Sequence, residues 1–149
     1  MNIWSGNWAW SMPLIVMSVI FHVICMAYIN DKVVQYARAH RNKRHFLWVF
    51  AIVMGLTTLL VTMLHAAEAA MWAQVYWLLG ALPDRKSAML YSLNAMTTYG
   101  HESYNLADHW RLMGALEALN GVILFGLTTA FLFAIIREVW TIEDGNARR

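Results

Sequence analysis

The residues that could do chemistry in this chain lie in one short segment and at a few isolated positions within apolar stretches. Residues 97–103 read Thr-Thr-Tyr-Gly-His-Glu-Ser, so hydroxyl groups, an imidazole and a carboxylate follow one another closely. An ionisable residue within an apolar stretch usually has a partner or belongs to a pathway for ions or protons. The isolated positions of this kind are His22, His65, Glu68 and Glu117.

Imidazoles and carboxylates can also ligate a metal or a haem iron. His22 lies in the middle of its apolar stretch and His65 near the end of another, so their depths do not match well for two axial ligands. A small membrane haem or metal redox protein is nevertheless an alternative function, and a haem absorption band would favour it. Its ligands would be His22, His65 or an outer group made of His101, Glu102, Asp108 and His109.

The composition places these residues in a membrane setting. The chain has 149 residues, of which 60% are hydrophobic and 13% are charged. A soluble domain usually has about 25% charged residues and about 45–50% apolar ones. The net charge of +2 is too small for a nucleic-acid-binding surface, and the single cysteine, Cys25, excludes an intramolecular disulfide. These values argue against a soluble enzyme and a nucleic-acid partner, and we predict no catalytic residues.

Three apolar runs are long enough to cross a hydrocarbon core about 30 Å thick. They cover residues 13–29, 46–64 and 118–136. Pro13 suits the first turn of the first helix. The apolar pattern of the second run continues to Pro83, so its helix is longer than a bilayer requires. The sequence therefore predicts an all-α membrane protein with three transmembrane helices.

The distribution of lysine and arginine predicts the orientation, because cytoplasmic loops carry an excess of these residues. Five lie between the first and second runs, three lie between the second and third, and three follow the third. The first loop and the C-terminus are therefore predicted to be cytoplasmic, with the N-terminus outside. The basic residues within 38–44 could also contact anionic lipid headgroups, although topological anchoring alone explains them.

A short helix is predicted between the second and third runs. Asp84 can cap it, and its apolar residues recur at helical spacing over Arg85–Met96. This helix is too short to span a bilayer, and residues 97–103 after it are not helical in character. The two segments together predict a re-entrant loop, whose backbone is tolerated at membrane depth only if it is buried or lines water.

This arrangement resembles the pore-loop potassium-channel superfamily, in which a pore helix leads into a Thr-x-Gly-Tyr-Gly-Asp filter. More narrowly, the chain is similar to short bacterial three-span potassium-channel-like proteins. The resemblance extends from about residue 46 to residue 140. It rests on the filter segment, on His65-Ala-Ala-Glu68, on Leu-Leu-Gly-Ala-Leu at 78–82 and, most closely, on Trp-Arg-Leu-Met-Gly-Ala-Leu-Glu-Ala-Leu-Asn-Gly at 110–121.

The resemblance implies a homotetrameric cation channel of the cell inner membrane, since each chain supplies only one filter loop. Residues 1–45 would form the first transmembrane helix and the basic loop, residues 46–140 the pore domain, and residues 141–149 a short cytoplasmic tail. The implied ion-conducting filter consists of Thr97, Thr98, Tyr99, Gly100, His101 and Glu102.

The filter segment departs from the family pattern in its outer half. Thr98 aligns with the filter threonine and Gly100 with the first glycine, whereas Glu102 replaces the second glycine. A residue with a Cβ at positive φ costs about 1 kcal/mol or more. Four Glu102 carboxylates around one axis would attract divalent cations, and four His101 imidazoles would add sensitivity between about pH 5 and 8. We therefore expect weak selectivity among K⁺, Na⁺ and Ca²⁺, with Thr98, Tyr99, Gly100 and Glu102 contacting the permeant cation.

Other polar and small residues are expected to support this filter. Glu68 and Glu117 could hydrogen-bond to the back of the filter or pore helix, and His65 could pair with Glu68 three residues later. Gly121 and Gly126 lie in the third run, where each could be a gating hinge or allow close helix packing, the commoner role. A nonconducting channel-like subunit is a further alternative, because the filter departs from the family pattern.

Overall fold

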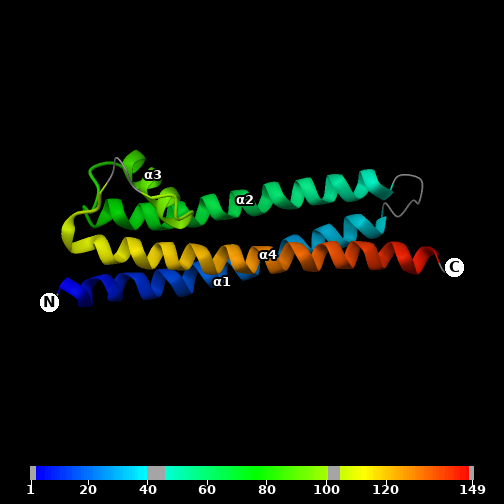
Figure 1. Cartoon of the computed structure of the whole chain (residues 1–149), viewed down its shortest axis with the longest axis horizontal. Coiled ribbons are helices and arrows are strands. Elements are labelled where there is room, and N and C mark those ends of the chain that lie inside the picture. Colours follow the sequence, from blue (N-terminus) through cyan, green and yellow to red (C-terminus); the bar gives the residue numbers. More distant parts are fainter. Residues whose placement is uncertain (1–2, 40–45, 101–104, 148–149) are drawn as a thin grey trace. The chain divides into compact units, whose positions relative to one another are not determined.

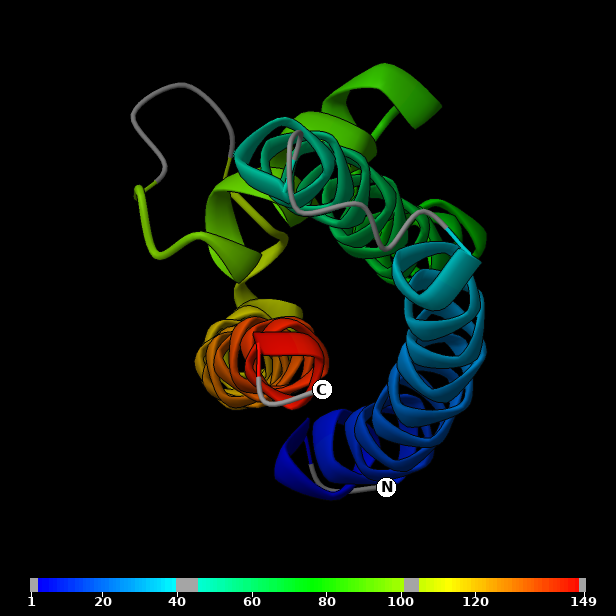
Figure 2. The same ribbon diagram turned by 90° about the vertical axis from the view of Figure 1, so that its right-hand side faces the viewer.

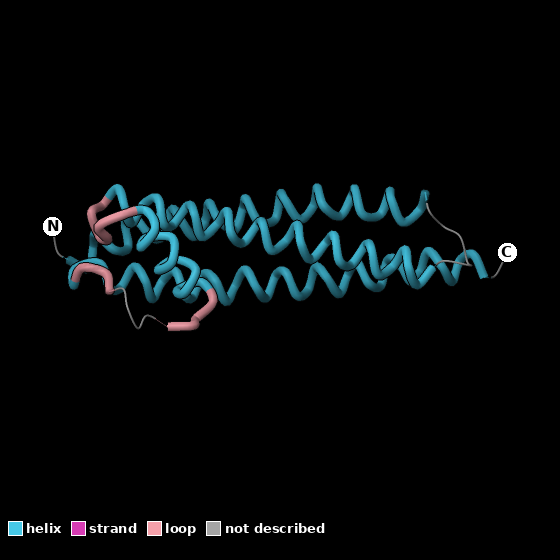
Figure 3. The backbone as a smooth tube through the Cα atoms, turned by 90° about the horizontal axis from the view of Figure 1, so that it is seen from above, coloured by secondary structure: helices cyan, strands magenta, loops and turns pink. Residues whose placement is uncertain are grey.

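Three long helices and one short helix make up most of the structure (Figure 1). This computed structural model describes residues 3–39, 46–100 and 105–147. Within them, α1 covers Ile3–Ala39, α2 covers Phe46–Leu78, α3 covers Arg85–Met96 and α4 covers Arg111–Ala147. A 3-10 turn, η2, covers Asp108–Trp110 directly before α4. Loops, drawn in pink in Figure 3, flank α3 on both sides.

Each of the three long helices contains a stretch long and apolar enough to cross a membrane. Large apolar side chains on these helices are exposed, among them Ile24 at 63%, Leu47 at 70% and Trp48 at 73%. Such surfaces are rare on soluble proteins, whereas lipid tails cover them well. The structure therefore confirms the prediction of an all-α protein with three helices of membrane-spanning length and composition.

Helix α1 begins at Ile3, well before the first apolar run. Pro13 lies inside this helix, so the prediction that it marks the first turn is wrong. Proline removes one backbone hydrogen bond within a helix. In the turns before Pro13, the Asn7 side chain is hydrogen-bonded to the backbone of His109 and Met113. Membrane helices tolerate proline where neighbouring helices provide partners for the backbone groups that it leaves free.

The chain divides into two compact units, and α1, α2 and α4 each contribute to both. The first unit comprises Met1–Phe21 and His65–Phe125, so it contains α3 and the predicted filter segment. The second unit comprises His22–Leu64 and Gly126–Arg149. Each unit has its own core of buried side chains.

The second unit is held by apolar and aromatic packing. Phe46 and Phe50 of α2 both meet Trp140 of α4 edge to face, with ring centroids 5.4 Å and 5.9 Å apart. Arg38 and Glu138 form an exposed ion pair at 3.6 Å. The core consists of Ile29, Val33, Ala37, Val53, Val61, Ile135 and Val139.

His22 is fully buried in the second unit. Its Nε2 lies 3.2 Å from the hydroxyl oxygen of Thr128 on α4. This contact between α1 and α4 gives the imidazole a polar partner in an apolar setting, as a buried polar group requires.

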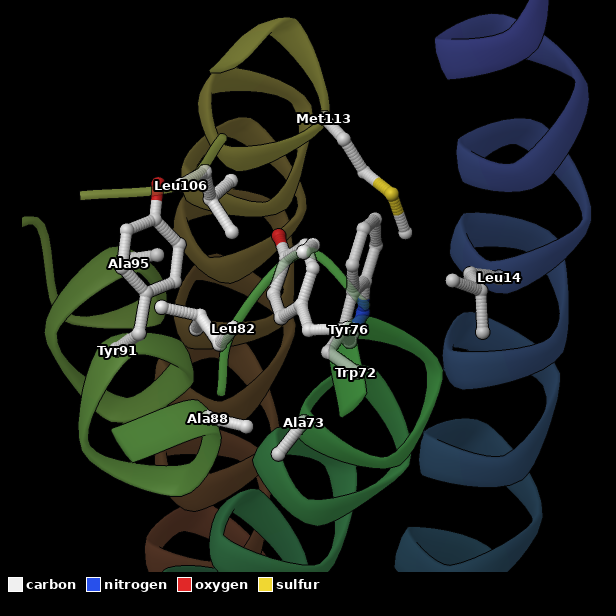
Figure 4. Packing of buried hydrophobic residues seen from close by; sticks show 11 residues of the cluster. Leu14, Trp72, Ala73, Tyr76, Leu82, Ala88, Tyr91, Ala95, Leu106 and Met113 are labelled. Carbon is white, nitrogen blue, oxygen red and sulfur yellow. The ribbon is translucent and has the colours of Figure 1, made fainter. Parts of the chain in front are cut away.

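The first unit packs α3 against the second half of α2 and the first half of α4 (Figure 2). Figure 4 shows its core, in which the Trp72 ring of α2 lies between Tyr76 of the same helix and Leu14 of α1, with Met113 of α4 beside it. Tyr76 also meets Tyr91 of α3 edge to face, with centroids 5.4 Å apart. One face of α3 is buried in this packing, through Ser87, Ala88, Tyr91, Ser92, Ala95 and Met96.

Helix α3 begins at the cap that the sequence predicts. The Asp84 carboxylate accepts hydrogen bonds from the backbone N–H groups of Lys86 and Ser87, at 2.9 Å and 3.0 Å, and from the Ser87 hydroxyl at 2.7 Å. These bonds, first of all the one from the Ser87 N–H, lower the pKa of Asp84. The predicted bounds of this helix, Arg85–Met96, are confirmed.

Candidate functional site

The end of α3 leads directly into the predicted filter segment. The backbone N–H groups of Thr98 and Tyr99 donate to the carbonyls of Ala95 and Asn94, both at 3.0 Å. Thr98 has a φ of 56° and Gly100 a φ of 98°. Left-handed backbone at a non-glycine residue costs about 1–2 kcal/mol. The two hydrogen bonds are those of a Schellman cap, which places the residue after the C-cap of α3 at positive φ, and a β-branched residue in this position is rare.

The side chains of this segment are exposed in the single chain. The Tyr99 side chain is 83% exposed. The Thr97 hydroxyl instead donates to the Leu93 carbonyl at 2.7 Å, so it completes the last turn of α3. His101 and Glu102, predicted to line the outer half of a filter, lie outside the described residues.

An open groove of about 370 Å³ lies beside the segment. Its walls come from α3, from the segment and from α4, and small α4 residues leave the space open. Tyr91 is buried in one wall, and this burial is the main reason that its pKa is raised to about 12. The lining residues are Tyr91, Asn94, Ala95, Thr98, Gly100, Arg111, Gly114, Ala115 and Ala118.

A buried polar cluster lies on α3 behind the segment. Glu117 of α4 has no exposed surface. The Tyr76 hydroxyl donates to its Oε2 at 2.7 Å, and its Oε1 is hydrogen-bonded to the Ser92 hydroxyl. The Ser92 oxygen also lies 2.7 Å from the carbonyl oxygen of Ala69. This cluster joins α2, α3 and α4 through polar contacts, and Glu117 thus lies where it contacts the predicted pore helix.

His65 and Glu68 form a second buried polar pair on α2. The His65 Nδ1 lies 3.1 Å from the Glu68 Oε2, as their spacing of three residues suggests. The imidazole also stacks on the Phe125 ring of α4, with centroids 4.3 Å apart. The two residues are therefore built into the contact between α2 and α4.

The glycines of α4 differ in their surroundings. A Cβ on Gly121 would lie only 2.8 Å and 2.9 Å from backbone carbons of Met96, and one on Gly114 would lie 3.1 Å from the Tyr91 ring. Both glycines therefore let α4 approach α3 closely. A Cβ on Gly126 would meet no described neighbour within 4 Å. The packing role considered for Gly121 is thus visible in the structure, while Gly126 faces open space in the described part of the chain.

Several polar contacts of the first unit were missed by the sequence analysis. Asn7 of α1 donates to the His109 carbonyl at 2.7 Å and accepts from the Met113 N–H at 3.0 Å. Asn120 of α4 donates to the Ser18 hydroxyl at 2.9 Å. A signal for them was present, because an amide within an apolar run needs a buried partner.

Comparison with known proteins adds no relative to this picture. No family model matches the sequence, and neither the curated proteins nor the solved structures give a match. The function is therefore argued from the residues and the geometry.

Proposed function

We propose that the chain is one subunit of a homotetrameric pore-loop cation channel in a bacterial inner membrane. The observation that carries the proposal is the end of α3, a short helix that lies between two helices of membrane-spanning length. This helix leads into Thr98 and Gly100, both at positive φ and two residues apart. Residues 97–102 would form the filter, with the N-terminus of the chain outside and its C-terminus in the cytoplasm.

The backbone of the segment suits cation binding for two physical reasons. The C-terminal end of a helix carries a partial negative charge, so α3 would favour a cation near its last turn. Residues at positive φ can turn successive carbonyl groups toward a common axis, where they replace the water shell of a cation. The cap at the end of α3 holds Thr98 in this conformation, two residues before Gly100.

The exposed surfaces near the segment support assembly. One chain supplies one loop, whereas carbonyl coordination from all sides needs several loops around an axis. The exposed Tyr99 ring and the open groove beside it are surfaces that neighbouring subunits would cover. We propose four copies, with K⁺ and Na⁺ as permeant ions and Glu102 as the group that weakens selectivity and attracts Ca²⁺.

Reversal potentials in planar bilayers test this function. The purified chain is reconstituted and measured under potassium/sodium and then potassium/calcium gradients. A reversal near zero with sodium, or a shift toward the calcium potential, is expected. A reversal near the potassium equilibrium potential would contradict the proposed effect of Glu102, and silence under every gradient would favour a nonconducting subunit.

Two glycine variants make the test specific to the segment. Gly100→Ala places a Cβ on a residue at a φ of 98°, so it should abolish the current. Gly55→Ala in α2 is the matched control, because a Cβ there has open space around it among the described residues and Gly55 has no proposed role in the filter or the gate. Equal currents in both variants would exclude residue 100 from the conduction pathway.

A further inference from the structure

The hydrogen bonds around Glu117 can be counted proton by proton. Three contacts join four groups: Tyr76 with Glu117, Ser92 with Glu117, and Ser92 with the Ala69 carbonyl. Each hydroxyl has one hydrogen to donate, so Tyr76 and Ser92 supply two hydrogens. A carboxylate and a backbone carbonyl only accept. Three contacts therefore need a third hydrogen, and the remaining group that can carry one is the Glu117 carboxyl.

The direction of each bond follows from this count. The Ala69 carbonyl can only accept, so the Ser92 hydroxyl donates to it at 2.7 Å. The Ser92 oxygen must then accept the bond that joins it to the Glu117 Oε1. With an ionised Glu117, Ser92 would have to face two acceptors with one hydrogen, and one acceptor would be left unsatisfied in a buried site.

The surroundings of Glu117 also favour a neutral group. Its described hydrogen-bond partners are two hydroxyls, and the side chain is fully buried. A buried carboxylate without a cationic partner is strongly disfavoured. On α3, the cation Arg85 stacks on Trp77 with its guanidinium 4.2 Å from the ring centroid, and at the start of α4 Arg111 pairs with Asp108 at 2.7 Å.

The other titratable groups of the first unit are not among the described hydrogen-bond partners of the Glu117 carboxyl. On α2, His65 and Glu68 contact each other at 3.1 Å. The part of α1 in this unit has no titratable side chain in its described residues 3–21. The remaining titratable groups on the described residues of α3 and η2, and in the turn before α3, are Asp84, Lys86, Tyr91 and His109.

We propose that Glu117 is a neutral carboxylic acid that donates its proton to Ser92 and so acts as the positioning residue that fixes α3 on α2 and α4. Ser92 lies five residues before Thr97, which corresponds to about 7–8 Å along a helix. The protonation of Glu117 stands on the contacts alone. Its consequence for ion conduction, that α3 holds the filter in place without a fixed charge behind it, rests on the proposed function.

Infrared spectroscopy of the full-length protein tests the protonation directly. At about pH 6.5 an ordinary glutamate is ionised, because its pKa is about 4.3. The wild-type minus Glu117→Gln difference spectrum should contain a protonated-carboxyl C=O band at this pH, and the band should shift in D₂O. Glu68→Gln and Glu138→Gln are the matched controls, because each removes another acid of α2 or α4. The spectra of both control variants should still contain the C=O band of Glu117. A difference spectrum that shows a carboxylate band instead would overturn the proposal.

Rescue by the conservative variant gives an independent readout. A glutamine amide can donate to Ser92 and accept from Tyr76, so Glu117→Gln should keep the wild-type unfolding midpoint and reversal potential. Glu117→Ala and Ser92→Ala remove the contact and should lower the midpoint. If Glu117→Gln unfolds as early as Glu117→Ala, the ionised form is required and the proposal is wrong.

The two readouts separate this proposal from the channel function. A protonated-carboxyl band in a protein that carries no current would uphold the assignment of Glu117 and count against the channel. Current in a protein whose Glu117 is ionised would support the channel and overturn the assignment.

Discussion

The close approach of α3 to α4 at Gly121 makes a sharp prediction. Replacing Gly121 by alanine would place a Cβ 2.8 Å and 2.9 Å from backbone carbons of Met96, and against the Met96 carbonyl oxygen. Carbon atoms in contact normally lie about 3.5–4.0 Å apart, so the two helices would have to separate by about 0.6 Å or more. The clash is with backbone at the last residue of α3, which cannot move aside as a flexible side chain would.

The size of the effect follows from two opposing contributions. Overpacking of this kind typically destabilises by about 1–3 kcal/mol. Alanine in place of glycine within a helix stabilises by roughly 0.5–1 kcal/mol. At Gly126 only the second contribution applies, because a Cβ there has no described neighbour within 4 Å. Because the second contribution is common to both variants, it cancels, and the two alanine variants should differ by about 1–3 kcal/mol in the free energy of unfolding.

Denaturant unfolding of the detergent-solubilised protein measures this difference, with helix content followed by circular dichroism. Gly121→Ala should unfold at a lower denaturant concentration than wild type, and Gly126→Ala at an equal or higher one. The hinge role considered for Gly121 makes another prediction, in which gating changes and stability does not. Equal stability of the two alanine variants would therefore refute the packing argument.

Three further predictions concern the caps and contacts of the first unit. Hydrogen bonds in the folded state lower the pKa of Asp84, so its cap stabilises the protein above the ordinary pKa of about 3.9 and loses this effect as the pH falls. The difference in melting temperature between wild type and Asp84→Ala should therefore shrink at about pH 3. Burial raises the folded pKa of Tyr91 to about 12, so the stability of the protein should fall as the pH rises above the ordinary tyrosine pKa of about 10. Tyr91→Phe should reduce this fall in melting temperature between about pH 10 and 12. Asn7→Ala leaves the Met113 N–H without its partner and should destabilise by about 1–3 kcal/mol in denaturant unfolding, whereas the exposed change Trp4→Phe should have little effect.

The parts of the fold that depend on local sequence could be predicted. The three long helices follow from apolar runs of membrane-spanning length, and α3 follows from its Asp84 cap and the apolar residues at helical spacing. Pro13 misled the prediction of the α1 start, because the turns before Pro13 are helical and their residue Asn7 contacts residues about 100 positions away, which the local sequence does not reveal.

The geometry of the candidate site was harder to predict for the same reason. Nothing in the local sequence indicates that Thr98, a β-branched residue, adopts a positive φ. The sequence places Glu117 near the predicted pore helix through a resemblance, but Ser92 and Tyr76 become its partners only when three helices meet. Gly121 left two roles open until the position of Met96 was known.

The two amide contacts of α1 determine how the first unit can move. Asn7 accepts a hydrogen bond from the Met113 N–H, and Ser18 accepts one from the Asn120 amide. The first parts of α1 and α4 therefore run in the same direction and are joined at two heights. Two hydrogen bonds at different heights restrict both helices, because sliding or rotating one helix against the other would break at least one of them. One residue inserted between Asn7 and Ser18 would turn one partner by about 100° relative to the other and break this register. A displacement of the first half of α4 that keeps both contacts must therefore carry residues 3–21 of α1 with it.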